Sequence, residues 1–103
     1  MGLKNEMVNV LIKRKSLNMN DDFGIQKCWT EMTKILTQNA DETINYFNEC
    51  NEDDLYYISE VFEDIAEKLQ SEKFINCLRK LDKKFPGLEM TKDINIAESY
   101  IKY

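Results

Sequence analysis

The sequence predicts an all-α fold of five to six short helices, stacked as antiparallel αα-hairpins in an irregular bundle or a HEAT-like mini-solenoid. Three observations predict it. Apolar residues recur at steps of three and four along most of the chain, which is the spacing of one helix face. One proline and three glycines leave little material for β-turns. The connections between periodic segments are brief, as in stacked hairpins.

The size of the chain predicts a single helical domain over residues 1–103, because 103 residues can bury one hydrophobic core. Hydrophobic residues make up 43% and charged residues 32%, which is ordinary for a folded protein and too apolar for a disordered one. The apolar runs are too short for a membrane span, and charges interrupt the N-terminal apolar positions, so no secretory signal is expected. We therefore expect a cytoplasmic protein with no membrane contact, and a monomer rather than an oligomer.

The first predicted helix lies near the N-terminus. Leu3, Met7 and Leu11 are spaced by four, and we expect Val8 and Ile12 to widen this buried stripe.

The second helix has the same spacing and includes the only tryptophan of the chain. Its expected core residues are Ile25, Trp29, Met32 and Leu36. Asp21 or Asp22 is expected to cap its first turn.

The third helix, over residues 40–50, offers Ile44 and Phe47 after an acidic first turn, which the helix dipole favours. The fourth has the clearest pattern, and its continuous apolar stripe consists of Leu55, Ile58, Phe62, Ile65 and Leu69. Both patterns predict amphipathic helices with one buried face.

The fifth and sixth helices complete the fold. Ser71 is expected to cap the fifth, which carries Phe74, Ile75, Leu78 and Leu81 and stops before Pro86-Gly87. Because so few residues join the fourth and fifth helices, we expect these two to form an αα-hairpin. Thr91 with Asp93 is expected to cap the sixth, which bears Ile94, Ala97 and Ile101.

The residue types argue against an enzyme, because the chain contains no histidine, the commonest general base. Cys28 lies beside Trp29, but nothing near it in the sequence would activate a thiol nucleophile. The three cysteines, which are Cys28, Cys50 and Cys77, have no CxxC spacing. We therefore expect reduced and mostly buried thiols.

A calcium loop is the one metal site that the sequence suggests, with Asn18, Asn20 and Asp22 at its first, third and fifth positions. The pattern then fails, because Phe23 stands where the loop needs glycine and Trp29 where it needs glutamate. We interpret this segment as an Asx-rich turn, and we expect no metal and no cofactor.

The net charge of −5 argues against direct binding of nucleic acid, which needs clustered Lys and Arg. A helical wheel at ~100° per residue places a set of acidic residues and tyrosines on the side of the fourth helix away from its apolar stripe. That set comprises Asp53, Tyr56, Tyr57, Glu60, Glu63, Asp64 and Glu67. Outward tyrosines among carboxylates suit a basic protein partner. Alternatively, the acids form a solvated face and the tyrosines pack between helices.

The stretch "LYYISEVFEDIAEKLQSEKFINCLRKLDKKFP", Leu55 to Pro86, resembles small all-helical immunity proteins of bacterial contact-dependent growth inhibition and related polymorphic toxin systems. The later "IAESYI" matches their last helix, and "IQKCWTEMTKIL" with "NADETINYFNEC" is compatible with their preceding hairpin. The resemblance implies a protein that binds a cognate toxin domain and blocks its active site or substrate cleft. The toxins are often nucleases, and we expect an RNase first and a DNase next. The family implies no fixed contact residues.

Two alternatives involve no toxin. A helical adaptor or regulatory subunit would bind another helix through an exposed apolar patch. An acidic DNA-mimic inhibitor would share the acidic face with an immunity protein.

Overall fold

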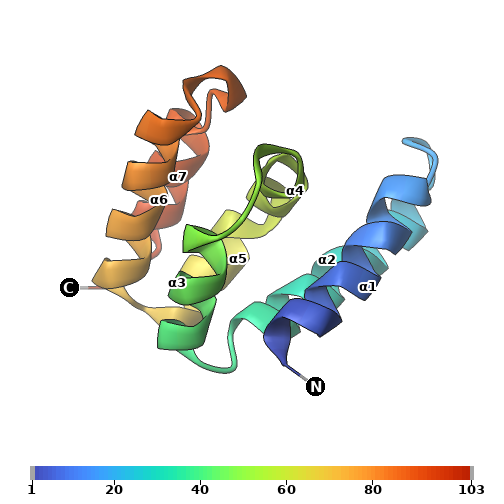
Figure 1. Ribbon diagram of the computed structural model, residues 1–103, viewed down its shortest axis with the longest axis horizontal. Coiled ribbons are helices and arrows are strands. Elements are labelled where there is room, and N and C mark those ends of the chain that lie inside the picture. The colour runs from blue at the N-terminus through green and yellow to red at the C-terminus, as the bar shows by residue number, and fades with distance from the viewer. Residues whose placement is uncertain (1, 103) are drawn as a thin grey trace.

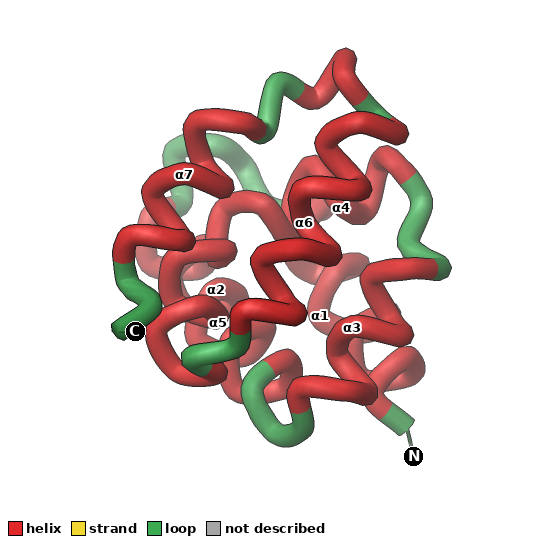
Figure 2. The backbone as a smooth tube through the Cα atoms, turned by 90° about the vertical axis from the view of Figure 1, so that its left-hand side faces the viewer, coloured by secondary structure: helices red, strands yellow, loops and turns green. Residues whose placement is uncertain are grey.

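The computed structural model describes residues 2–102, which contain helices and no β-strand (Figure 1), so the predicted all-α class is confirmed. The α-helices are α1 (Leu3–Ser16), α2 (Asp22–Leu36), α3 (Ala40–Asn48), α4 (Glu52–Ile58), α5 (Phe62–Leu69), α6 (Glu72–Lys84) and α7 (Thr91–Ser99). Two short 3-10 helices, η1 (Ser59–Val61) and η2 (Pro86–Leu88), complete the regular structure. Short loops join these elements (Figure 2).

The helices form two layers of stacked pairs (Figure 1). Helices α1, α3 and α6 lie in the nearer layer, and the chain returns behind each of them through α2, α5 and α7. Within the layers α3 packs on α6 and α5 packs on α7, while α1 packs closely on α2. This order matches the stacked antiparallel pairs that the sequence predicts.

The predicted fourth helix is interrupted. Its residues form α4 and α5, joined by η1, whose last residue Val61 has φ −120° and ψ 14°. At the break the Ser59 hydroxyl donates to the Tyr56 carbonyl oxygen (2.6 Å). The two parts bury their apolar faces against different neighbours, α4 against α1 and α5 against α7. Packing against two separate surfaces therefore overrides the continuous helical period.

The predicted hairpin between the fourth and fifth helices is wrong. Helix α6 packs chiefly on α3 and α7 and has few close contacts with α5. Gln70, between α5 and α6, has the left-handed conformation φ 47°, ψ 45°, which turns the chain sharply. Its side chain also donates to the Tyr100 carbonyl oxygen (2.8 Å) and accepts from the Lys102 amide (2.7 Å). The turn therefore also holds the end of α7.

The centre of the core is an aromatic cluster that joins both layers. The Phe47 ring of α3 lies 6.0 Å from Phe62 of α5 and 5.5 Å from Phe74 of α6, in edge-to-face geometry. All three side chains are fully buried. The predicted apolar residues of the last three stripes are buried as expected, apart from the partly buried Leu69.

The predicted stripe of α1 is correct only in part. Met7 and Leu11 are buried, but Ile12 is 62% exposed and Val8 is also exposed. Val10, which was not predicted, takes a buried position in their place. The face that α1 presents to α2 and α3 is thus rotated toward Val10, and Val8 and Ile12 turn outward.

Two of the predicted caps are present. The Asp21 carboxylate accepts from the Gly24 amide (3.0 Å), and the Ser71 hydroxyl oxygen accepts from the Phe74 amide (3.2 Å). The predicted cap at Thr91 is wrong, because Met90 precedes α7 and the Thr91 hydroxyl donates to the Asp82 carboxylate instead.

Removing the Ser71 cap provides a test of the α5–α6 junction. Ser71→Ala should lower the free energy of unfolding by about 1 kcal/mol, because the Phe74 amide loses its acceptor. Urea denaturation followed by circular dichroism measures the change. Ser16→Ala is the control, since Ser16 is exposed at the end of α1 and should cost less than about 0.5 kcal/mol. Equal losses in the two variants would contradict the capping role.

Candidate partner-binding surface

The structure divides the seven predicted surface residues among three elements. Asp53, Tyr56 and Tyr57 lie on α4, Glu60 on η1, and Glu63, Asp64 and Glu67 on α5. Because η1 interrupts the helix, they do not form the single helix face that the wheel predicts.

The two tyrosines have different environments. Tyr56 is 57% exposed, whereas Tyr57 is partly buried against the core. Their rings meet edge-on with centroids 5.2 Å apart. The Arg14 guanidinium carbon lies 5.1 Å from the centroid of the Tyr57 ring, and the Lys15 ammonium lies 5.8 Å from it, both within cation–π range. Tyr57 therefore packs between helices, as the alternative interpretation holds, and Tyr56 is the tyrosine that a partner can reach.

Asp53 forms an ion pair on the surface. The Lys15 ammonium lies 2.7 Å from its carboxylate and 2.6 Å from that of Asp54. Hydrogen bonds to these two carboxylates raise the pKa of Lys15. The negative charge of α4 is thus partly neutralised within the molecule.

Glu60 lies at the surface, but its carboxylate is bound within the molecule. Its carboxylate accepts from Arg14 through Nε (2.8 Å) and Nη2 (2.6 Å), and from the Trp29 indole N–H (2.9 Å). The Glu60 side chain is 27% exposed and that of Arg14 only 10%. The hydrogen bond to Glu60 raises the pKa of Arg14. Glu60 therefore holds α1, α2 and η1 together.

The three remaining carboxylates lie on α5. Glu63, Asp64 and Glu67 are all exposed, and none forms an ion pair with another described residue. They remain the acidic part of the predicted surface that is open to a partner.

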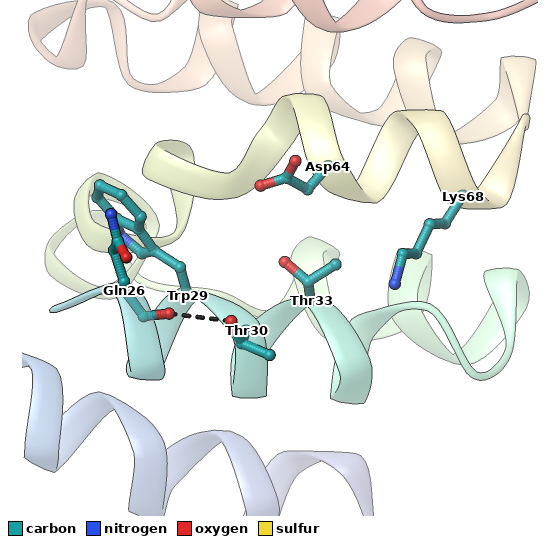
Figure 3. Close-up of a pocket in the computed structure, with 6 residues that line it drawn as sticks. All are labelled: Gln26, Trp29, Thr30, Thr33, Asp64 and Lys68. Atoms are coloured by element: carbon teal, nitrogen blue, oxygen red, sulfur yellow. Dashed lines mark hydrogen bonds between the residues drawn. The ribbon is translucent and has the colours of Figure 1, made fainter. Parts of the chain in front are cut away.

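A hollow between α2 and α5 was not predicted (Figure 3). It has a volume of about 340 Å³, and its lining residues are Gln26, Trp29, Thr30, Thr33, Asp64 and Lys68. Trp29 and Gln26 lie at one end and Lys68 at the other, with Asp64 above them. A second hollow of about 300 Å³ shares Gln26 and Trp29, and is also lined by Arg14, Met19, Asp22, Ile25 and Glu60.

Trp29 is therefore at the surface of a groove and not deep in the core, contrary to the prediction. It is partly buried, and its indole N–H is bound to Glu60. Sequence reasoning missed two exposed apolar residues near the start of α2. Met19 is 86% exposed and Phe23 is 79% exposed. Phe23 falls outside the apolar stripe that begins at Ile25, and this departure from the helical period could have indicated an outward position.

The three cysteines are free thiols in the interior. Cys28, Cys50 and Cys77 are buried and unpaired, which confirms their predicted burial. Burial raises the pKa of each thiol, that of Cys50 to about 11. Within residues 2–102 no group of three or more potential ligands could hold a metal ion.

Comparison with known proteins identifies no relative. No family model matches the chain, and neither the curated proteins nor the solved structures contain a significant match. Among the described residues, no helix combines the length and apolar character that a membrane crossing requires.

Proposed function

We propose that this protein is an immunity protein of a contact-dependent growth inhibition or related polymorphic toxin system. It binds the cognate toxin domain in the cytoplasm of the protected cell and blocks its active site or substrate cleft. The preferred target is a nuclease, an RNase before a DNase. The resemblance of the stretch from Leu55 to Pro86 to immunity proteins is the reason for proposing this system. The exposed carboxylates of α5 are the observation that supports binding to a basic toxin surface.

The charge of α5 supports a basic partner. Glu63, Asp64 and Glu67 are exposed on two turns of helix, and the whole chain has a net charge of −5. A nuclease cleft is basic because it holds phosphates, so an acidic surface accelerates encounter with it. Tyr56, exposed on the neighbouring α4, offers an aromatic anchor of the kind enriched at interface hot spots.

A helical adaptor or regulatory subunit is the second candidate function. The high exposure of Met19 and Phe23 favours it, because an adaptor binds its partner helix through apolar contacts.

Co-expression separates these two functions. Where the gene immediately upstream encodes a large secreted protein, its C-terminal domain is the toxin candidate. The test is whether this chain rescues growth and binds that domain directly. An immunity protein should restore growth and bind the isolated domain. Lack of both effects contradicts the proposed function.

Charge reversal then tests the acidic surface. The double variant Glu63→Lys/Glu67→Lys should stay folded and bind the toxin domain with an association rate about tenfold lower at low salt, and with weaker salt dependence. Stopped-flow association at several salt concentrations measures both effects. Glu49→Lys/Glu89→Lys is the control, because it changes the net charge equally at exposed positions outside α5. If the two double variants slow association equally, α5 is not the contact surface.

A further inference from the structure

We propose that the α2–α5 groove is a docking site for an arginine or lysine side chain that a partner protein presents beside apolar residues. The groove consists of the two adjoining hollows that share Gln26 and Trp29. This inference rests on the proposed function for the basic character of the partner. It places the main contact with that partner in the groove, which the sequence did not indicate.

The apolar part of the groove lies at the start of α2. Met19 lines the hollow beside Trp29. Phe23 stands three residues before Gln26 and seven before Thr30, so it lies on the same side of α2 as these two lining residues. Among the large hydrophobic side chains that are exposed, Met19 and Phe23 have the greatest exposure. Met19 thus lines the second hollow, and Phe23 lies on the same side of α2 as lining residues without lining a hollow itself. Single exposed apolar residues are ordinary, whereas exposed apolar residues that gather near a hollow are typical of an interaction site.

The charged part of the groove favours a cation near Trp29. Asp64 lines the first hollow and Asp22 the second, and the Glu60 carboxylate in the second hollow is already paired with Arg14. Arg14 is held by Glu60 through two hydrogen bonds, and Lys68 lies at the opposite end from Trp29 (Figure 3). An aromatic ring with carboxylates close to it attracts a guanidinium or ammonium group through cation–π and Coulomb interactions.

The aromatic ring is already held in place. The Trp29 indole N–H donates to Glu60, and Glu60 is fixed in turn by Arg14. A partner side chain therefore meets a ring that loses little freedom on binding, which favours affinity. Thr33, which is buried on α2, also lines the first hollow.

Charge complementarity selects the occupant. A second copy of this chain would bring another net charge of −5 to an acidic groove, and an acidic segment would meet the same repulsion. A basic segment with flanking apolar residues satisfies both the carboxylates and the exposed Met19 and Phe23. Lys68 gives the site a direction, since the basic group of the segment would lie toward Trp29 and away from Lys68.

The only tryptophan provides a direct measurement. The probe is a short synthetic peptide that alternates arginine and leucine, and the control peptide carries glutamate in place of arginine. Binding of the basic peptide should change the fluorescence of Trp29 and shift backbone amide NMR signals of α2 and α5, while the acidic peptide leaves both unchanged. Signals that shift mainly on other helices, or equally with both peptides, overturn the inference.

Matched variants on α5 distinguish the groove from general charge. Asp64→Lys should weaken binding of the basic peptide about tenfold or more, whereas Glu67→Lys, with the same change in charge on the same helix but outside the groove lining, should weaken it only about twofold. Lys68→Glu should strengthen binding several-fold. Equal effects of Asp64→Lys and Glu67→Lys, or weaker binding by Lys68→Glu, overturn the inference.

A second pair of variants tests the apolar contact. Phe23→Ser should weaken binding, and Ile12→Ser, which removes another exposed apolar side chain on α1, should not. Should Phe23→Ser have no effect, or should Phe23 bury itself in a dimer of this chain at the protein concentrations used, the proposed occupant is wrong.

The peptide assay contains no toxin, so it fails separately from the proposed function. If the chain binds the basic peptide in the groove but protects against no toxin, the docking site is supported and the immunity function is contradicted. If the chain protects cells but does not bind the peptide, the docking site is contradicted and the immunity function is supported.

Discussion

Phe47→Ala is expected to lower the free energy of unfolding by about 3–5 kcal/mol. Phe47 is fully buried and its ring contacts those of Phe62 and Phe74, so its removal leaves a cavity where α3, α5 and α6 meet. These partners lie 15 and 27 residues away in the sequence, and the cavity cannot close without moving two other helices. Since a small domain has only about 5–15 kcal/mol of stability, the variant should be close to unfolding at 37 °C.

Urea denaturation followed by circular dichroism measures this loss, and thermal melting provides a second reading. Phe23→Ala is the matched control, because it removes the same side chain from a position that is 79% exposed, and it should change stability by less than about 1 kcal/mol. A Phe47→Ala protein as stable as the Phe23→Ala protein would show that the aromatic cluster does not hold the two layers together.

Sequence reasoning identifies features that depend on neighbours three or four residues away. The stripes of α5 and α6 are correct because each helix buries one side, and the period of the helix then fixes which residues are inside. The caps at Asp21 and Ser71 are correct for the same reason, since a capping side chain bonds to an amide three residues on.

Sequence reasoning fails where the neighbour is distant. Nothing local distinguishes Glu60 from Glu63, yet Glu60 is held by Arg14, 46 residues away. Val8 and Val10 on α1 are equally apolar, and the packing of α1 on α2 and α3 decides that Val10 is inside. The break at η1 likewise follows from the different neighbours of α4 and α5. The α2–α5 groove needed the structure because its two walls are separate in the sequence.

Replacing Glu60 is the second change with a large expected effect. Glu60→Lys should lower the free energy of unfolding by about 2 kcal/mol, below the range for a fully buried ion pair, because Arg14 is buried but Glu60 lies at the surface. The variant leaves the Arg14 guanidinium without its two hydrogen bonds, places a second cation against it, and removes the acceptor of the Trp29 indole N–H. Glu63→Lys introduces the same change of charge three residues away at an exposed position and should cost less than about 0.5 kcal/mol.

The partner of Glu60 can be identified with a charge-swap cycle. If the loss in Glu60→Lys comes from Arg14, the double variant Arg14→Glu/Glu60→Lys should recover at least about 1 kcal/mol, because the pair is restored with reversed polarity. The recovery of the free energy of unfolding stays incomplete for two reasons. The lysine at position 60 makes one contact where the Arg14 guanidinium makes two, and lysine cannot accept a hydrogen bond from the Trp29 indole N–H. Trp29 fluorescence should differ from wild type in both the single and the double variant, because the indole N–H has lost its carboxylate in each. If Glu60→Lys costs no more than Glu63→Lys, then the ion pair between Glu60 and Arg14 does not stabilise the fold.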